Sequence, residues 1–327
     1  MRFYNIEISD PASGALIRKF SSLDSSGVTM LGALNVELDM PSYPFANPSG
    51  NDTLRVWGIP LKENAAASNY NNKLIRVYAG MSKGLPLANP KQQGLILEGI
   101  VNQCFGNWQG VDMTLDFIIV YGIGGTELAP KNLVLNWSKG ITLGAAVKST
   151  LMVAAQNALG SAGPPVTVVD NTSSALVLSQ DEPGFYENMA QFAGFVRTVS
   201  RHINPDPKYP GVNIAFRGNT FYLYDGTTIA APKAIAFQDL VGQPAWLDFQ
   251  TVQFKTAMRG DFNVSDYVTL PKGQVTTQAQ SSSQFRSQSA ISGVFQLDMI
   301  RHVGNFRQPD ANSWVTVFNC HLTTPAS

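Results

Sequence analysis

The chain has 327 residues, which at roughly 150 residues per domain predicts two or three domains, each able to bury its own core. Charged residues make up only 14% of the chain, against about 25% in typical globular proteins, so much of the surface must consist of uncharged polar residues and glycine. Lys plus Arg and Asp plus Glu number 23 each, and neither sign forms a block, which excludes a basic stripe that would bind phosphate strongly.

The start of the chain, MRFYNIEISD, lacks the basic beginning and apolar centre of a secretory signal. The sequence also contains no apolar run approaching the roughly 18 residues that a membrane span needs. We therefore expect synthesis and folding in a cytoplasm, without membrane contact. The two cysteines, Cys104 and Cys320, lie far apart on predicted strands without CxxC spacing, which favours buried free thiols over a metal or redox site.

Alternating apolar residues predict strands through the first third of the chain. In Leu34–Met40 the apolar residues alternate with Asn35, Glu37 and Asp39, which places one face on a core and the other against polar surroundings. Six strands separated by turn-rich gaps favour a closed barrel or a sandwich. The other five candidates are Tyr4–Ile8, Thr53–Ile59, Leu74–Met81, Leu95–Val101 and Met113–Tyr121.

Two gaps between these strands are rich in proline and glycine. Pro41–Asn51 carries three prolines and a Gly-Asn pair, and Gly80–Gln93 carries two prolines and further glycines. Such composition predicts projecting loops, and loops of this length usually contact partners.

The middle of the chain, Thr142–Ser200, predicts helices. Thr142 is a suitable cap for a helix with apolar residues at a spacing of three to four, and Gly160 followed by Pro164 would end it. A second helix is expected after Asp181, with Pro183 at an early helical position. Its apolar stripe, interpreted as core packing, consists of Phe185, Met189, Phe192, Val196 and Val199.

Strands return in the last third. Val212–Phe216 and Thr220–Tyr224 flank an Arg-Gly-Asn turn, which is a hairpin signal. The uncharged Ser-, Gln- and Thr-rich segment Gly273–Ser289 cannot bury enough apolar surface to fold alone, and we interpret it as a partner-binding loop, with a linker as the alternative. Further strands are expected at Val252–Thr256, Tyr267–Leu270, Val294–Ile300 and Ser313–Leu322. The strand-rich ends therefore resemble two loose copies of one plan.

Motifs that would indicate catalysis or metal binding are missing. The three histidines, His202, His302 and His321, form no HExxH or HxH pattern. Gly122–Glu127 lacks the last glycine of GxGxxG and leads into Leu-Ala-Pro instead of a helix, so it predicts a turn. No GxSxG elbow, P-loop or carboxylate pair stands out. We expect no enzyme activity, no cofactor and no metal.

Several segments resemble a known family. Three from the first third, Lys73–Met81, Gly94–Asn102 and Gly110–Thr114, are similar to the first barrel of the baseplate and tail hub proteins of tailed bacteriophages. The last third is similar to the second hub barrel, in which a strand, a short turn and a strand precede a Gly-led strand ending in His-x-Gly and then a Trp-containing strand. Those segments here are Val252–Met258, Val264–Leu270, Gly293–Asn305 and Ser313–Val317.

The resemblance implies a mainly β fold with a small α+β part, in three domains. These are a tail-tube-like β-barrel at residues 1–125, a helix-containing middle domain at 126–210, and a second barrel at 211–327 with the inserted loop 273–289. It further implies a virion protein assembled in the host cytoplasm: a baseplate hub whose homotrimer joins the hexameric tail tube to the trimeric spike and contacts other baseplate subunits.

Such a ring leaves a central channel through which DNA passes without specific binding. A lining of neutral or acidic side chains is expected, because basic ones would bind the passing phosphates. Asn35, Glu37 and Asp39 are the candidates for a channel-facing or interface-facing surface, and the alternative is an ordinary solvated face or a subunit contact. The competing function is a carbohydrate- or receptor-binding tail module with aromatic loop residues such as Tyr43, Phe45 and Trp108.

Overall fold

The computed structural model of the chain describes residues 1–47, 52–82, 89–121, 132–159, 165–248, 250–271, 291 and 293–325. The predicted turn Gly122–Glu127 and loop Gly273–Ser289 lie outside these residues, as do parts of Pro41–Asn51 and Gly80–Gln93. No helix in the described part is both long and apolar enough to cross a membrane.

Strands dominate the described chain, which confirms the predicted mainly β fold with a small helical part. The first block of strands comprises β1 (Arg2–Ser9), β2 (Leu16–Ser21), β3 (Val36–Ser42), β4 (Asp52–Trp57), β5 (Leu74–Met81), β6 (Gly94–Gln109) and β7 (Asp112–Tyr121). The middle part contains β8 (Leu133–Trp137), α2 (Leu143–Leu159), β9 (Thr167–Asn171), β10 (Glu182–Tyr186), α3 (Met189–Ile203), β11 (Asn213–Arg217) and β12 (Thr220–Tyr224).

The second block comprises β13 (Lys233–Ala234), β14 (Ala245–Trp246), β15 (Thr251–Ala257), β16 (Tyr267–Thr269), β17 (Gly293–Asn305) and β18 (Trp314–Pro325). The short helices are α1 (Leu61–Ala65), η1 (Ala67–Tyr70), η2 (Pro90–Gln92) and η3 (Phe237–Asp239).

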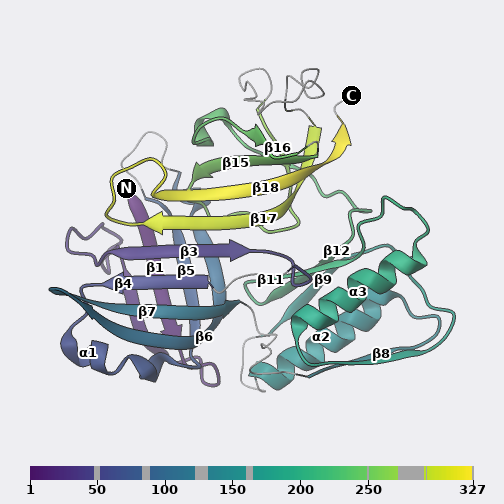
Figure 1. Cartoon of the computed structure of the whole chain (residues 1–327), viewed down its shortest axis with the longest axis horizontal. Helices are drawn as coiled ribbons and strands as arrows, with labels where there is room; N and C mark the ends of the chain where they lie inside the picture. The colour runs from purple at the N-terminus through teal and green to yellow at the C-terminus, as the bar shows by residue number, and fades with distance from the viewer. Residues whose placement is uncertain are drawn as a thin grey trace.

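One sheet runs through both blocks. Among the described residues it contains 13 strands. Eleven follow the order β14-β15-β18-β17-β3-β4-β7-β6-β5-β1-β2, and outside this path β16 pairs with β17 and β13 pairs with β16. In Figure 1, β3, β4 and β7 cross in front of β1 and β5, while β17 lies next to β3 in the middle of the molecule. β3 pairs with β4 along one edge and with β17 along the other. It therefore has no edge left for β2, the strand at the opposite end of the first block, and the block does not close into a barrel through these two strands.

The two blocks repeat one strand order. The first runs β3-β4-β7-β6-β5-β1 across the sheet and the second runs β14-β15-β18-β17-β16-β13. Strands at equivalent places in the two blocks also follow one another in the same order along the chain. Two differences are that β13 runs parallel to β16, whereas β1 is antiparallel to β5, and that β2 has no counterpart. The expectation that both ends follow one plan is confirmed at the level of strand order.

Local irregularities fall at matching places in the two blocks. β6 skips Asn102 in its pairing with β7, and β17 skips Asp298 in its pairing with β18. Just before β5 and β16, Asn72 and Ser265 have φ of 62° and 111°, values that are uncommon for residues other than glycine. The backbone N–H of each donates to the carbonyl of the residue before the bulge, at 2.8 and 3.1 Å. These independent coincidences support an internal duplication.

The middle part has its own core, in which α2 and α3 cover a three-stranded sheet of β11, β12 and β9 and a pair of β8 and β10. The predicted hairpin is confirmed as β11 and β12. It pairs with β9 and packs in this core, although the predicted division places it in the second barrel. The domain boundaries at 125/126 and 210/211 stay predictions.

The first predicted helix is confirmed as α2, whose N-terminal backbone N–H groups include one that donates to Thr142 Oγ1. The predicted start of the second helix is wrong. The segment around Pro183 is the strand β10, which pairs with β8, so Phe185 is 63% exposed instead of packing in a helical stripe. α3 starts at Met189 because the side chain of Asn188 accepts a hydrogen bond from the N–H of Gln191 and caps it.

Side chains cross from the second block into the core of the first. Met258 and Trp314 are buried among first-block residues, and Trp314 Nε1 donates to the carbonyl of Gly80 at 2.9 Å. Gly304 on β17 permits this, because a β-carbon there would lie 2.6 Å from the Trp314 ring and 3.1 Å from Leu38. The blocks therefore share a sheet and part of a core.

Gly304→Ala should destabilise the fold. The added methyl must displace the Trp314 ring, an overpacking that costs about 1–3 kcal/mol and lowers the melting temperature measured by calorimetry. Gly32→Ala is the control, because a β-carbon at Gly32 meets no atom within 4 Å and φ there is unstrained. Equal melting temperatures for the two variants would contradict the described packing.

Candidate functional site

The contact between the blocks is an antiparallel strand pair, which we name the seam. Ile300–Asn305 of β17 pair residue by residue with Glu37–Ser42 of β3, so that His302 lies opposite Met40. The period-two pattern of β3 buries Val36, Leu38 and Met40 and leaves its alternate side chains on the outer surface.

The predicted site residues lie at this seam. Glu37 and Asp39 project from β3 on the outer surface, and Asn35, just before the strand, accepts a hydrogen bond from the backbone N–H of Arg307 at 3.1 Å. Glu37 Oε1 accepts from Asn305 Nδ2 at 2.9 Å. The three residues therefore contact the second block of the same chain. That they also face a channel or another subunit stays a prediction.

The outer surface over the seam, which we name the seam face, carries charge in balanced pairs. Arg301 on β17 makes a bidentate ion pair with Asp39, with N–O distances of 2.5 and 2.7 Å. On the neighbouring strands Arg55 pairs in the same way with Asp116, at 2.5 and 3.1 Å. These carboxylates raise the pKa of both guanidinium groups, which therefore stay protonated. The negative charge of each carboxylate balances the positive charge of its arginine. The seam face is open and concave.

The turn after β17 is fastened to the N-terminus. The guanidinium of Arg2 donates to four backbone carbonyls of that turn, those of Asn305, Phe306, Gln308 and Asp310. The Phe306 ring packs edge-on against Tyr4, with 4.8 Å between centroids. This turn fixes the end of the seam to β1.

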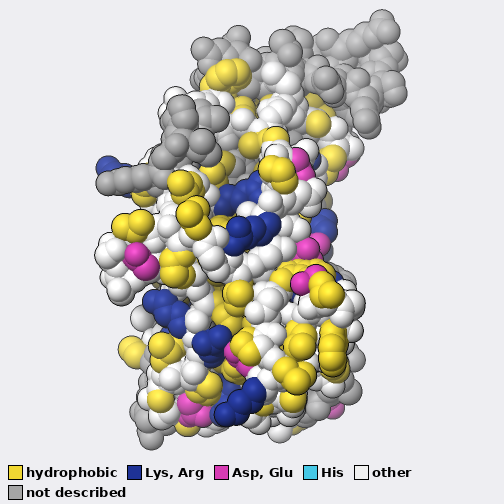
Figure 2. All heavy atoms as spheres, turned by 90° about the vertical axis from the view of Figure 1, so that its left-hand side faces the viewer, with side chains coloured by type: hydrophobic (Ala, Val, Ile, Leu, Met, Phe, Trp, Pro, Cys, Tyr) yellow, Lys and Arg dark blue, Asp and Glu magenta, His cyan; other side chains and the backbone are white. Residues whose placement is uncertain are grey.

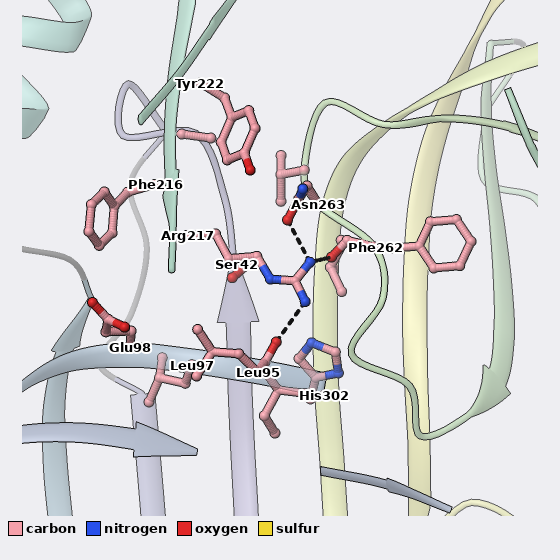
Figure 3. Close-up of a pocket in the computed structure, with 14 residues that line it drawn as sticks. Ser42, Leu95, Leu97, Glu98, Phe216, Arg217, Tyr222, Phe262, Asn263 and His302 are labelled. Carbon is pink, nitrogen blue, oxygen red and sulfur yellow. Dashed lines mark hydrogen bonds between the residues drawn. The ribbon is translucent and has the colours of Figure 1, made fainter. Parts of the chain in front are cut away.

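A second junction joins all three parts of the chain. Figure 3 shows Arg217, from the end of β11 in the middle part, with its guanidinium between the two strand blocks. It donates to the Leu95 carbonyl of β6 at 2.7 Å and to Asn263 Oδ1 of the second block at 2.5 Å. It also donates to the carbonyls of Phe262 and Gly260. The cavity beside it is only about 20 Å³, so the junction is filled by protein.

Glycines allow the backbones to meet at this junction. A β-carbon built on either Gly94 or Gly260 would overlap the backbone of the other, and the N–H of Gly260 donates to the Gln92 carbonyl at 2.8 Å. Sequence reasoning identified the turn beginning with Arg217 but not this role. The nearest signal was a basic residue immediately before a Gly-Asn hairpin turn.

One histidine at the seam and both cysteines are buried titratable side chains. His302 is buried, and its Nδ1 lies 3.0 Å from Thr316 Oγ1. Burial, with a smaller effect of Arg217, lowers its pKa to about 3, so the imidazole is neutral. Both cysteines are buried and free, as predicted, and burial raises the pKa of the Cys104 thiol to about 12. Within the described residues no cluster of His, Cys, Asp or Glu has a metal-binding arrangement.

The aromatic residues of the competing prediction do not gather into one platform. Phe45 packs against the middle part, where its ring lies 6.4 Å from that of Phe221 and its N–H donates to the Ile214 carbonyl. Trp108 is exposed, at the tip of the β6–β7 hairpin. Figure 2 shows the side of the molecule at the left of Figure 1, on which Lys and Arg side chains are scattered among hydrophobic ones.

No family model and no curated protein sequence matches the chain. Among solved structures, it is similar to the 43 kDa tail protein of prophage MuSo2 from Shewanella oneidensis, with 8% identity and a TM-score of 0.54 over 99% of this chain and 98% of that one. It is also similar to a chain of the PdpA-VgrG complex, with 7% identity and a TM-score of 0.51, over 100% of this chain and 66% of that one.

The tail protein of Neisseria meningitidis MC58 matches more weakly, with 10% identity and a TM-score of 0.47 over 98% of this chain and 96% of that one. At these identities the similarity concerns the fold. The whole chain therefore has the fold of a phage tail protein, which confirms the resemblance found in the sequence.

Arg217→Met should weaken the junction between the three parts. Four buried acceptors lose a charged donor, and we expect the free energy of unfolding to fall by about 3 kcal/mol in urea titrations. Arg18→Met is the matched control, because its half-exposed pair with Glu63 is worth only about 0–1 kcal/mol. Equal losses in both variants would contradict the junction.

His302 should make the protein sensitive to mild acid. The unfolded chain protonates this imidazole near pH 6.5, whereas the folded chain does so only near pH 3, so protons favour unfolding between these values. Stability is unaffected above pH 6.5 and falls by up to about 1.4 kcal/mol per pH unit below it. Urea titrations from pH 7 to 4.5 should show a steeper fall for the wild type than for His302→Gln; parallel curves would refute this.

Proposed function

We propose that this chain is a structural hub of a bacteriophage tail baseplate. Three copies would form a ring of six strand blocks that joins a hexameric tail tube to a trimeric spike. The observation that carries the proposal is the duplication: two blocks of one strand order lie side by side in a single continuous sheet. The full-length similarity of the fold to the tail protein of prophage MuSo2 supports it.

The way in which the two blocks meet supports a ring. The in-chain seam uses different edges of the two blocks, β17 of the second and β3 of the first, so it is a head-to-tail contact. Head-to-tail contacts repeat around an axis and close into a ring when the rotation permits. A chain with two such blocks can match a six-fold tube with only three copies.

The seam face is the surface that we assign to a central channel. Its arginines, Arg55 and Arg301, are held by the carboxylates of Asp116 and Asp39, and Glu37 adds further acidic oxygens. Passing DNA would therefore meet few free positive charges, which suits rapid transit without retention. In this proposal the protein acts through shape and surface charge, without catalysis, and resides in the virion beside other baseplate subunits.

The purified chain should assemble at micromolar concentration. Mass photometry is expected to find a species of three times the 35.4 kDa chain mass, and negative-stain electron microscopy to show rings with a central opening. A stable monomer at all concentrations up to tens of micromolar would contradict the hub. Binding on a glycan array by that monomer, without affinity for tube or spike subunits, would support the carbohydrate- or receptor-binding function instead.

A further inference from the structure

The two blocks differ in the use of one equivalent strand edge. β17 continues beyond the last residue that pairs with β16, and its second half pairs with β3 to form the seam. β6 likewise continues beyond Ile100, the last of its residues that pairs with β5. In the described part of the chain the following residues, Gln103–Gln109, pair with β7 alone. The half of β6 that corresponds to the seam half of β17 therefore has no strand along its second edge, where the side chain of Asn71 accepts a hydrogen bond from the N–H of Cys104 at 2.8 Å.

The strand that corresponds to β3 in the second block, β14, also has an unpaired edge. β14 occupies the place of β3 in the second block: Ala245 pairs with Gln253 on β15 as Asp39 pairs with Thr53 on β4. β3 has strands on both sides, whereas β15 is the one neighbour of β14 among the described strands. Unpaired strand edges pair with another chain or promote aggregation unless something covers them.

We infer that these two edges pair with each other between two copies of this chain: the second half of β6 in one copy adds to β14 in the next. The inference rests on the proposed ring and names the strands that close it. The occupant is a second copy because the seam already shows that these two kinds of edge fit together within one chain.

The duplication sets the register of the contact between copies. The bulges at Asn102 and Asp298 align β6 with β17, and the β3–β4 and β14–β15 pairs align β3 with β14. The seam pair Val303–Asp39 then becomes Asn107 opposite Ala245.

The pair Arg301–Pro41 becomes Phe105 opposite Leu247 in the same register. Leu247 continues β14, since its N–H donates to the Thr251 carbonyl at 2.9 Å. Phe105 is 46% exposed and Leu247 54%, although both are large and apolar. By the alternation of their strands both lie on the outer surface that includes the seam face. Their contact would bury two apolar side chains where the in-chain seam has a charged arginine.

A disulfide can trap the register. In the variant with both Asn107→Cys and Ala245→Cys, the new cysteines of two neighbouring copies would lie directly opposite each other on adjacent strands. Their Cα separation would then be within the range that a disulfide spans. Mild oxidation should yield covalent trimers on non-reducing gels, at more than ten times the yield of either single variant. Asn107→Cys with Phe237→Cys, a second-block residue 50% exposed outside β14, is the register control. The native cysteines are buried and should not cross-link.

Charge substitutions provide a second test on the folded protein. Phe105→Asp and Leu247→Asp should each weaken trimers at least tenfold, and Phe105→Lys combined with Leu247→Asp should restore them. Phe185→Asp, at an exposed site on β10, should leave assembly unchanged. Thermal melts verify folding.

The outcomes separate the two proposals. Trimers that neither cross-link at these positions nor respond to the charges would overturn this interface and leave the hub in place. A wild-type chain that stays monomeric would overturn both. Cross-linking at the control pair equal to that at the opposed pair would also overturn the register.

Discussion

The antiparallel pairing of β17 with β3 is the contact on which the rest of the structure depends. It joins segments separated by more than 250 residues, between Glu37 and Asn305, and converts two blocks into one sheet. Backbone hydrogen bonds alone would allow the strands to slide, but Trp314 and Gly304 fix the register, because the indole fits only over a residue without a side chain. The Arg2 contacts then fasten the following turn.

The middle part ties the two blocks together. Arg217 reaches from its hairpin to acceptors in both blocks, and the glycines beside it allow the two backbones to come into contact. A guanidinium suits this place since its five donors satisfy several carbonyls at once. The helices α2 and α3 lie away from the seam, on the far side of the β11–β12 hairpin in Figure 1.

The proposed hub would need rigid blocks, matched strand edges and a surface that does not retain the DNA passing along it. The duplicated strand order supplies the first two, with one pair of edges joined within the chain and an equivalent pair left over. Paired arginines and carboxylates supply the third. The fold shared with a phage tail protein, the repeated strand order and the paired charges are therefore all consistent with the proposed structural role.

Residue patterns predicted many of the strands, one long helix and the buried faces of these elements. Alternation in Leu34–Met40 specified β3 and its outward Glu37 and Asp39, because a half-buried strand needs apolar residues at every second position. These patterns did not reveal β10, because Pro183 suits a first helical turn as well as a strand, and pairing with β8 decided between them. Only the tertiary structure showed which edges meet and what Arg217 binds. Strand edges and carbonyl acceptors are backbone groups that nearly every residue carries, so no residue pattern marks their partners.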